Sequence, residues 1–373
     1  MKNIFYVSEY RVGKNDDEAI FECFGARTNC AGEATVVFSG EDYLISRAIE
    51  IPSDTTVIVD GCMIKLCDGS FDNVFRGNNY VLSEDNPFGF PIEIKPIRNV
   101  KILGKNRATL SGPDKNPLMK NYMTGKVEEP LGDFWGWRTL TISLSECDGF
   151  EIGGFSFENA RCWTLSFDIC SNGYIHDLHF NTDVKNGDGI DFRSGCHNCV
   201  VEKITGFTGD DTVACTALRK TAASVPSPSK IYPGEYYLYP MEPTGYITDR
   251  TQYECDISDI IIRNVKTCGK HHGIICLAAN GCRIYNVEID NIGEVVAEDM
   301  SLCREATVKV YTGYGSGYTK GDIKDITISN VTALYAKNAF YCNAEVENVI
   351  LENVTNDNGD TFRIDYPDGI VIK

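Results

Sequence analysis

The sequence has 373 residues, and its hydrophobic fraction of 43% is that of a folded chain, which excludes global disorder. Asp and Glu number 53 against 35 for Lys and Arg, so the formal net charge is −18. This charge repels phosphate backbones and anionic lipid, so we expect no nucleic-acid partner and no membrane-surface role. The longest apolar run near the start, Ile4–Val7, is too short for a signal-peptide core or a membrane span.

The 16 cysteines bear on the cellular compartment. The chain is long, shows no signal segment and has a single Cys-x-x-Cys pair, Cys196 and Cys199, which cannot supply the four ligands of a structural zinc site. We therefore expect reduced cysteines that pack as small apolar residues, and a cytoplasmic location. We also expect no bound metal and no other cofactor.

The first predicted element is a helix near the N-terminus. Asn15 and Glu18 stand at the spacing of a capping box, which marks a helix start. Four apolar residues then fall on one helical face: Ala19, Ile20, Cys23 and Phe24. Short strands are predicted at 34–38 and 43–46. A helix followed by strands can cover the open end of a stacked β structure, so residues 1–50 are predicted to form an N-terminal cap region.

From residue 152 onward the sequence repeats two apolar residues three positions apart, followed by a turn residue. The pairs are Ile152/Phe155, Ile175/Leu178, Val201/Ile204, Ile262/Val265, Ile284/Val287, Ile328/Val331 and Leu351/Val354. Most successive pairs follow one another at a short, nearly constant interval, which we take as one coil of a repeat. Two intervals are longer. We interpret the interval from Val287 to Val331 as two coils. We interpret the interval from Ile204 to Val265 as two coils plus an insertion of about 17 residues.

A repeat of short strands at this period cannot bury its own apolar face, whereas stacked repeats share a continuous core. The β-branched runs favour strands, and the consensus of a leucine-rich repeat is absent. The sequence therefore predicts an all-β protein, a single right-handed parallel β-helix over residues 1–373.

Two segments interrupt the repeat, at about 113–137 and 219–250. Both are rich in proline and aromatic residues. Proline cannot donate within a central ladder, so both are predicted to be loop insertions that leave the coil. They either build the walls of a groove or pack on the outer surface.

Acidic residues cluster beside glycines at two places one coil apart. Asp188 follows Asn186, and the pair Asp210 and Asp211 follows Gly209, so that Asp188 and Asp210 are separated by one period of the repeat. At that period the side chains should lie on neighbouring rungs of one face, and crowding should raise the pKa of at least one carboxyl. Asp210 and Asp211 can share a cleft only at a bend, which Gly209 permits. Either cluster alone would be interpreted as a sequence typical of turns. Two such clusters separated by one coil of the repeat favour a catalytic site.

Three further candidates lie downstream. His272 precedes a glycine at the start of an apolar strand, where it could hydrogen-bond an acid. Lys309 and Tyr311 alternate out of the strand at 308–312 and therefore share a face, and this strand is predicted to fill a missing rung. Tyr314 follows in a glycine-rich loop, where it either offers its ring to a sugar or simply marks a turn.

These motifs resemble glycoside hydrolase family 28, the polygalacturonases and their relatives. Asn186 and Asp188 match the family's Asn-x-Asp, and residues 209–211 match its Gly-Asp-Asp. His272 with the glycine after it matches part of Gly-His-Gly, although His271 replaces the first glycine. The resemblance covers most of the chain, and the cap is similar to that of the wider pectate-lyase-like superfamily.

The resemblance implies a polygalacturonase-like enzyme that hydrolyses a glycosidic bond, with inversion, in a plant-type or host oligosaccharide. It implies that Asp210 is the general acid and that Asp188 and Asp211 activate the attacking water. It implies that His272 supports the acid through a hydrogen bond. Inversion implies carboxylates roughly 6.5–9.5 Å apart with water between them.

One motif departs from the family. Its Arg-Ile-Lys, which grips a galacturonate carboxylate, reads Lys309-Val310-Tyr311 here. Lysine lacks arginine's bidentate fork, and tyrosine carries no charge. The departure argues against polygalacturonate itself and makes a neutral or rhamnose-containing unit a candidate. The predicted substrate-binding residues are Lys309, Tyr311, Asn186 and Tyr314, whereas Arg193 is expected to be a solvated surface charge.

Two other functions fit the same fold. A β-helix polysaccharide lyase or epimerase would bind calcium through Asp clusters and use an arginine or lysine base, whereas the presence of His272 favours hydrolysis. A non-catalytic carbohydrate-binding protein usually presents long trimerising stretches, which are not evident here. In each case the predicted partner is a carbohydrate, and the oligomeric state and the choice between exo and endo action stay open.

Overall fold

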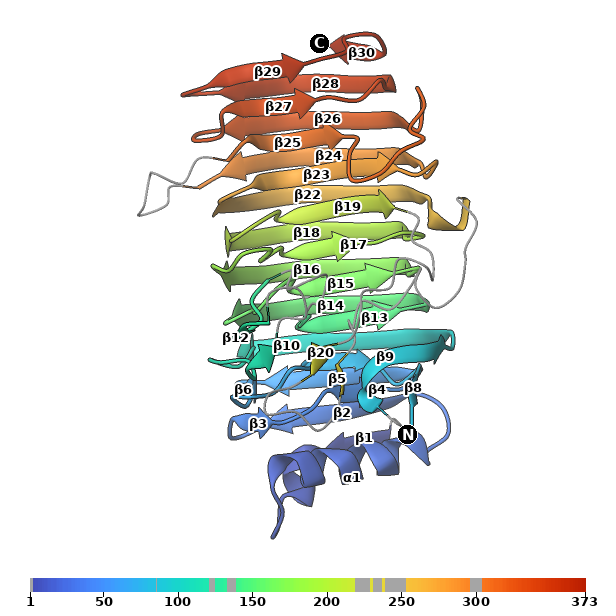
Figure 1. The fold of residues 1–373 in the computed structure, drawn as a ribbon. Coiled ribbons are helices and arrows are strands. Elements are labelled where there is room, and N and C mark those ends of the chain that lie inside the picture. The colour runs from blue at the N-terminus through green and yellow to red at the C-terminus, as the bar shows by residue number, and fades with distance from the viewer. Residues whose placement is uncertain are drawn as a thin grey trace.

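The structure is a computed structural model of a right-handed parallel β-helix, as the sequence predicts. The strands stack from the N-terminal end, coloured blue, to the C-terminal end, coloured red (Figure 1). The described residues are 3–84, 86–120, 125–132, 139–218, 229–230, 237–238, 253–295 and 304–373.

Two parallel sheets run along the stack. The long-strand sheet contains β1 (Asn3–Tyr6), β2 (Ala34–Ser39), β3 (Tyr43–Ile45), β5 (Thr55–Asp60), β6 (Met63–Leu66), β10 (Ile97–Ser111), β14 (Cys147–Glu158), β16 (Ser171–Thr182), β18 (His197–Thr208), β22 (Ile257–Gly269), β24 (Ile284–Glu294), β26 (Ile323–Ala333), β28 (Glu347–Asn356) and β30 (Ile370–Ile372). The short-strand sheet contains β4 (Ile49–Ile51), β7 (Phe75–Gly77), β13 (Ile142–Ser145), β15 (Leu165–Asp168), β17 (Ile190–Phe192), β19 (Val213–Leu218), β23 (His272–Ala279), β25 (Ala306–Tyr311), β27 (Asn338–Cys342) and β29 (Asp360–Ile364). Their inward-facing apolar side chains form one continuous core.

Each apolar pair of the repeat encloses a bend in a long strand. The residue just before the second member of every pair has a left-handed backbone, with φ between +52° and +79°: Gly154, Asp177, Lys203, Asn264, Asn286, Asn330 and Asn353. This residue turns the strand, so both apolar neighbours point inward although they are three positions apart. Asparagine tolerates this conformation and also stacks on its neighbour, as where Asn291 Nδ2 donates to Asn264 Oδ1 at 2.6 Å.

The strand register corrects two intervals of the repeat. Val265 faces Ile292 rather than Val287, and Ile292 in turn faces Val331. Ile292, not Val287, is therefore the residue of this coil that is equivalent to Val265 and Val331. The error arose because each coil has two bends with the same local signature. Val287 lies at the other bend, where Asn286 is the left-handed residue.

The long intervals are single coils with insertions, not double coils. Ile204 faces Val265 directly across β18 and β22, so the segment between them contains one coil and one long insertion. The strand that carries Lys309 is therefore not a missing rung. It is β25, the short-sheet strand of the coil between β24 and β26.

The predicted cap helix is confirmed. α1 (Asp16–Thr28) covers the N-terminal end of the stack (Figure 1). Its capping box is complete, since the Glu18 N–H donates to Asn15 Oδ1 at 2.9 Å and the Asn15 N–H donates to Glu18 Oε2 at 3.1 Å. The four residues predicted for its inner face are all buried: Ala19, Ile20, Cys23 and Phe24. Arg27 is buried with them. The helix shields the first rungs from pairing with another chain.

Both predicted insertions leave the coil wherever they are described. The first contains the antiparallel pair β11 (Met119–Lys120) and β12 (Val127–Glu128), and the second contains β20 (Ser229–Lys230) and β21 (Tyr237–Leu238). β20 contacts β11, and β21 contacts β9 (Asn86–Ile94), which pairs with β8 (Tyr80–Ser83). The second insertion therefore reaches back to the first. Residues 121–124, 133–138 and most of 219–252 lie outside the described residues.

The cysteines behave as small apolar residues. Those in the described part of the chain are free thiols, and most are buried in the core. Burial raises the pKa of the Cys147 and Cys199 thiols to about 12, so neither is reactive at neutral pH.

The cytoplasmic location stays a prediction. No helix in the described part of the chain is long and apolar enough to cross a membrane.

Lys203 offers a test of the bend mechanism, because it is the one bend residue of the seven pairs that is not Gly, Asp or Asn. A left-handed backbone costs an ordinary residue about 1–2 kcal/mol, and asparagine less. Lys203→Asn should therefore raise the free energy of unfolding by roughly 0.5–1 kcal/mol, measured as a higher urea midpoint. Lys203→Ala is the control, because it also removes the exposed ion pair with Asp177 but keeps the backbone cost. An equal gain in both variants would contradict the mechanism.

Candidate active site

The two acidic motifs lie immediately before neighbouring strands of the short-strand sheet. Asp188 precedes β17, while Asp210 and Asp211 precede β19. The register of these strands places Asp188 beside Asp211, one position from the alignment with Asp210 that the sequence period suggests. One oxygen of each of the three carboxyls lies within 4.8 Å of the other two. The structure therefore brings both motifs into one acidic cluster.

Asp210 and Asp211 share this cluster because the chain bends between β18 and β19 at Gly209. A Cβ atom at Gly209 would overlap the carbonyl oxygen of Val184 in the neighbouring coil. Glycine is required there because two backbones approach closely, not because its φ is positive. The bend that the sequence predicts is present, and its cause is this close approach.

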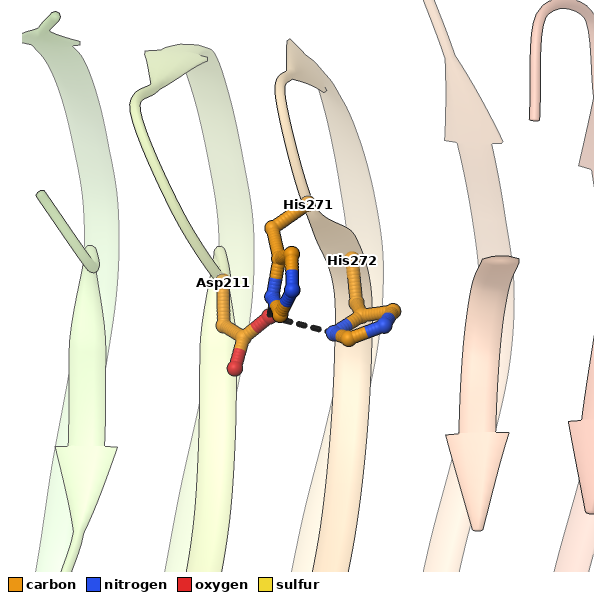
Figure 2. Close-up of side chains that lie close together, drawn as sticks. All are labelled: Asp211, His271 and His272. Atoms are coloured by element: carbon orange, nitrogen blue, oxygen red, sulfur yellow. Dashed lines mark hydrogen bonds and ion pairs between the residues drawn. The ribbon is translucent and has the colours of Figure 1, made fainter. Parts of the chain in front are cut away.

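His271 and His272 extend the cluster from the next coil (Figure 2). Their Nδ1 atoms lie 3.0 and 2.7 Å from one oxygen, Oδ1 of Asp211. His271 Nδ1 also lies 2.8 Å from Oδ1 of Asp210. The expected contact between His272 and Asp210 is therefore wrong. The register of β19 and β23 places His272 beside Asp211, and it is His271, one residue earlier, that reaches Asp210.

The histidines set the charge state of the cluster. Burial alone would raise the pKa of Asp211, but the charge of His272 and hydrogen bonds from both rings outweigh it and hold the pKa well below its usual range. Hydrogen bonds to Asp210 and then to Asp211 raise the pKa of His271 to about 10. The pKa of Asp211 is thus lowered, whereas crowding of carboxyls was expected to raise the pKa of at least one of them. Asp211 is ionised at neutral pH and can orient water, but it cannot donate a proton.

The nearest oxygens of Asp188, Asp210 and Asp211 lie within 4.8 Å of one another. Neighbouring rungs of a parallel sheet are only about 4.8 Å apart, so residues in register on adjacent coils approach closely at their nearest atoms. The separation of roughly 6.5–9.5 Å that inversion implies refers to whole carboxyl groups with water between them, and it stays a prediction.

A buried polar cluster fixes the backbone beneath the acidic residues. Thr212 Oγ1 lies 3.0 Å from the hydroxyl oxygens of both Thr208 and Thr267. Arg304, only 2% exposed, donates to the hydroxyls of Thr212 and Thr267 at 3.1 Å each. The Thr208 hydroxyl donates to the carbonyl oxygen of Asp210 at 3.0 Å. These bonds cross three coils and hold the bend in place.

Arg304 has a counter-charge in Glu294, whose Oε1 lies 4.0 Å from its Nη1. The other oxygen of Glu294 accepts from the consecutive backbone N–H groups of Leu334, Tyr335 and Ala336 at 2.7, 2.6 and 3.0 Å. Removing one partner of a buried ion pair is strongly destabilising, because it leaves the other charge buried and uncompensated. This pair ties the acidic cluster to the coils beyond it.

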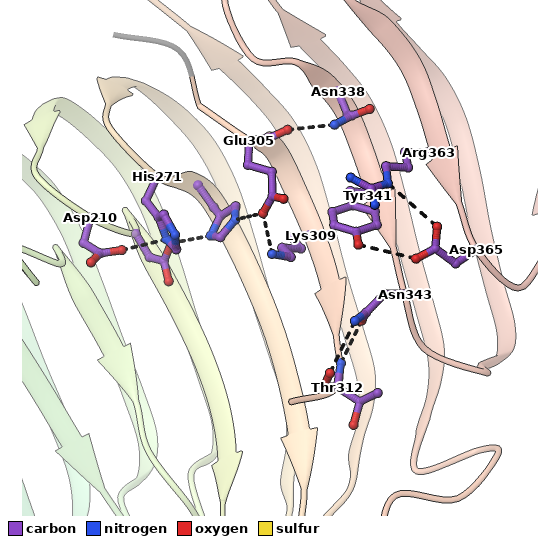
Figure 3. A network of polar contacts seen from close by, with 12 residues as sticks. Asp210, His271, Glu305, Lys309, Thr312, Asn338, Tyr341, Asn343, Arg363 and Asp365 are labelled. Atoms are coloured by element: carbon purple, nitrogen blue, oxygen red, sulfur yellow. Dashed lines mark hydrogen bonds and ion pairs between the residues drawn. The ribbon is translucent and has the colours of Figure 1, made fainter. Parts of the chain in front are cut away.

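Lys309 and Tyr311 share a face of β25, as predicted, and Lys309 Nζ lies 4.4 Å from the centroid of the Tyr311 ring. The ring centroid of Tyr341, on β27, is 5.1 Å from the same nitrogen. Glu305 Oε2 lies 2.6 Å from Lys309 Nζ and 3.2 Å from His272 Nε2. Figure 3 shows the resulting network, which runs without a break from the acidic cluster through both histidines to the lysine.

The remaining predicted substrate-binding residues lie at turns. Tyr314 is 80% exposed, and its ring centroid is 6.0 Å from that of Tyr311. Partial desolvation, followed by the charges of Tyr311 and the three acidic residues, raises the pKa of Tyr314. Asn186 has a left-handed backbone in the turn before β17. Sugar binding by these residues stays a prediction.

Sequence reasoning missed Arg304 and Glu305 and misjudged Arg193. Arg193 is 8% exposed, not solvated, and its guanidinium lies 4.4 Å from the centroid of the Trp163 ring. A signal for Arg304 and Glu305 was present. Two polar residues stand shortly before the apolar part of three successive short strands, as Asp210-Asp211, His271-His272 and Arg304-Glu305.

The cluster also contains donor sets that suit a metal ion. Asp211, His271 and His272 each offer one ligand atom within 4.8 Å of the others, and so do the three carboxyls. The mixed nitrogen and oxygen set would suit zinc or manganese, and the all-oxygen set magnesium or calcium. In the first set, hydrogen bonds between the two rings and Asp211 already occupy these atoms. The prediction that this site binds no metal ion is unchanged.

The comparisons with known proteins identify similar folds. No family model and no curated protein matches this sequence. A hyperthermoactive exopolygalacturonase from Thermotoga maritima has a TM-score of 0.54 at 12% identity, covering 100% of this chain and 92% of that one. A mutant tailspike protein of E. coli bacteriophage HK620, in complex with pentasaccharide, has a TM-score of 0.60 at 12% identity, covering 99% of this chain and 66% of that one.

A third similar structure is a 1,3-alpha-1,4-beta-D-galactose-4-sulfate-3,6-anhydro-D-galactose-2-sulfate 4 galactohydrolase. Its TM-score is 0.57 at 10% identity, with 98% of this chain and 90% of that one covered. At such identities the likeness establishes the fold. This chain therefore shares the parallel β-helix fold of these three proteins, while membership of family 28 stays a prediction.

The raised pKa of His271 predicts how stability depends on pH. A group whose pKa rises on folding stabilises fully below its unfolded value of 6.5, and this contribution is lost as pH rises through about 10. Wild type should therefore exceed His271→Gln in unfolding midpoint at pH 6, and the difference should shrink steadily towards pH 10. The side chain is 46% exposed, so added salt should reduce the difference. A difference that is independent of pH would contradict the assignment.

Proposed function

We propose that this protein is a glycoside hydrolase that cleaves a glycosidic bond in an oligosaccharide by a polygalacturonase-like mechanism. Asp210 gives its proton to the departing oxygen. Asp188 and Asp211 hold the water that attacks the anomeric carbon, and a carboxylate of this pair accepts the proton that the water loses. His271 steadies Asp210, and His272 orients Asp211. This replaces the expected pairing of His272 with the acid.

The observation that carries this proposal is the convergence of three carboxyls and two imidazoles from three successive coils at one edge of the short-strand sheet. Glycoside hydrolysis needs one carboxyl that gives a proton and another that stays ionised, and their surroundings must differ. Asp211 is only 11% exposed and lies against two rings. Asp210 is 21% exposed and lies against one ring, so it is the more accessible of the two carboxyls.

The similar structures support a carbohydrate substrate. Two of them are described as an exopolygalacturonase and a galactohydrolase, and the tailspike protein is bound to a pentasaccharide. The free cysteines support our expectation of a reducing compartment. Within the proposal the substrate is an oligosaccharide of plant or host type.

The first test removes the proton donor. Asp210→Asn keeps the size of the side chain but cannot supply a proton, so turnover should fall by about 10²–10⁴-fold while folding is retained. Product release from a panel of plant and host oligosaccharides measures the change. Asp259→Asn is the matched control, since Asp259 is an exposed bend residue of the long-strand sheet and asparagine also tolerates its left-handed backbone. Full activity of Asp210→Asn would show that the assignment is wrong.

The second test follows the anomer that is formed first. Asp211 is a poor nucleophile, because both histidines donate to its oxygen and its pKa is lowered, so water attacks and the configuration inverts. Proton NMR during the first turnovers identifies the product anomer. Retention would instead make one of the closely spaced carboxylates the nucleophile. An unsaturated product that absorbs ultraviolet light would indicate a lyase.

A further inference from the structure

Lys309, on β25, is linked to the acidic cluster through Glu305 and His272, and its charge is already compensated. Its Nζ atom lies 2.6 Å from Glu305 Oε2, so the two form an ion pair. The ring centroids of Tyr311 and Tyr341 lie 4.4 and 5.1 Å from the same nitrogen. The Lys309 side chain is only 9% exposed. A carboxylate and two aromatic rings of the protein itself therefore already surround the ammonium group.

Glu305 is held firmly in this position. Its N–H donates to the His271 carbonyl at 3.1 Å, and its own carbonyl accepts from the Asn338 side chain at 2.9 Å. Burial by itself raises the pKa of Glu305, but hydrogen bonds from Lys309 and His272 lower it to about 2. The side chain is 37% exposed, so this ionised carboxylate reaches the surface of the site.

The next cation along the same face is also paired. Lys309 faces Tyr341, and Tyr341 faces Arg363, so the three stand in one column of the short-strand sheet (Figure 3). The Arg363 guanidinium lies 4.2 Å from the Tyr341 ring centroid, and its Nε lies 3.7 Å from Asp365 Oδ1. The outward-facing cations of β25 and β29 thus each carry a carboxylate of their own.

We propose that Glu305 determines specificity by standing where the carboxylate of an anionic sugar would otherwise meet Lys309, so that the site takes uncharged sugar units and rejects uronates. This inference rests on the proposed glycosidase function and names its substrate class. A uronate would have to displace Glu305 from Lys309 or lie beside its charge. An uncharged sugar meets no such repulsion, and its hydroxyls can donate to the free lone pairs of Glu305.

The experiment compares binding of matched sugars without turnover. A glycan array carries glucose- and galactose-containing oligosaccharides together with their glucuronate and galacturonate counterparts. All proteins carry Asp210→Asn, so that bound sugars are not cleaved. We expect the parent protein to bind uncharged glycans. Glu305→Gln, which keeps the shape but not the charge, should shift the binding ratio towards uronates by about tenfold or more, and less at high salt.

Two controls isolate the role of Lys309. Lys309→Met added to Glu305→Gln should abolish the gain, whereas Lys337→Met, which removes an exposed cation in register with Glu305, should leave most of it. Asp183→Asn removes an exposed carboxylate that forms an ion pair with Lys270, the residue before His271. This substitution should not change the ratio of uronate to uncharged glycan binding.

Each outcome has one meaning. An unchanged ratio in Glu305→Gln, or a parent protein that already prefers uronates, overturns the role of Glu305 while leaving glycan hydrolysis intact. If the shift towards uronates persists when Lys309→Met is added to Glu305→Gln, the role of Glu305 is overturned as well. Lys309 would then not be the cation that binds the uronate. Binding to no glycan by any variant counts against the proposed function itself.

Discussion

Parallel register between successive coils is the constraint on which the site depends. Pairing places each residue about 4.8 Å from its partner in the next coil, however many residues the chain uses to complete the turn. Ile190 faces Val213 after one ordinary coil, whereas Val213 faces Ile274 across the long second insertion. The same register brings Asp188, Asp211 and His272 into contact distance. An insertion of any length is compatible with this geometry, provided that it leaves the coil between strands, as the proline-rich segments do.

A stack at this spacing favours alternation of charge, since like charges on adjacent rungs repel through a partly buried path. Beyond the acidic cluster the contacts alternate in charge. Asp211 lies against His272 and His272 against Glu305 on successive coils, and Glu305 pairs with Lys309 of its own coil. The same alternation explains why crowding does not raise the pKa of Asp211, because the rung that follows the acidic motifs supplies two imidazoles instead of another carboxylate. Beneath this row the buried Arg304 supplies a further positive charge.

The features that the sequence predicts well are those whose signal is local. The capping box of α1, the glycine bend before Asp210 and the apolar pairs around each left-handed residue are all legible within a few positions. What failed was the assignment of coils across insertions. Val287 and Ile292 follow bends of identical local appearance, so only the strand register distinguishes them. Glu305 was missed for a related reason, because its role depends on a lysine in its own coil and a histidine from the preceding coil.

If the two proposals hold, the network links substrate choice to catalysis. One oxygen, Glu305 Oε2, contacts both Lys309 and the ring of His272, which in turn contacts Asp211. Within these proposals, a change at Glu305 acts both on the charge that a sugar meets and on the ring that orients Asp211. Arg363 and Asp365 lie two coils further and touch neither group in the contacts described. Substitutions there can alter the outer part of the face without disturbing Asp211, whereas at Glu305 binding and turnover change together, which is why binding is measured separately from turnover.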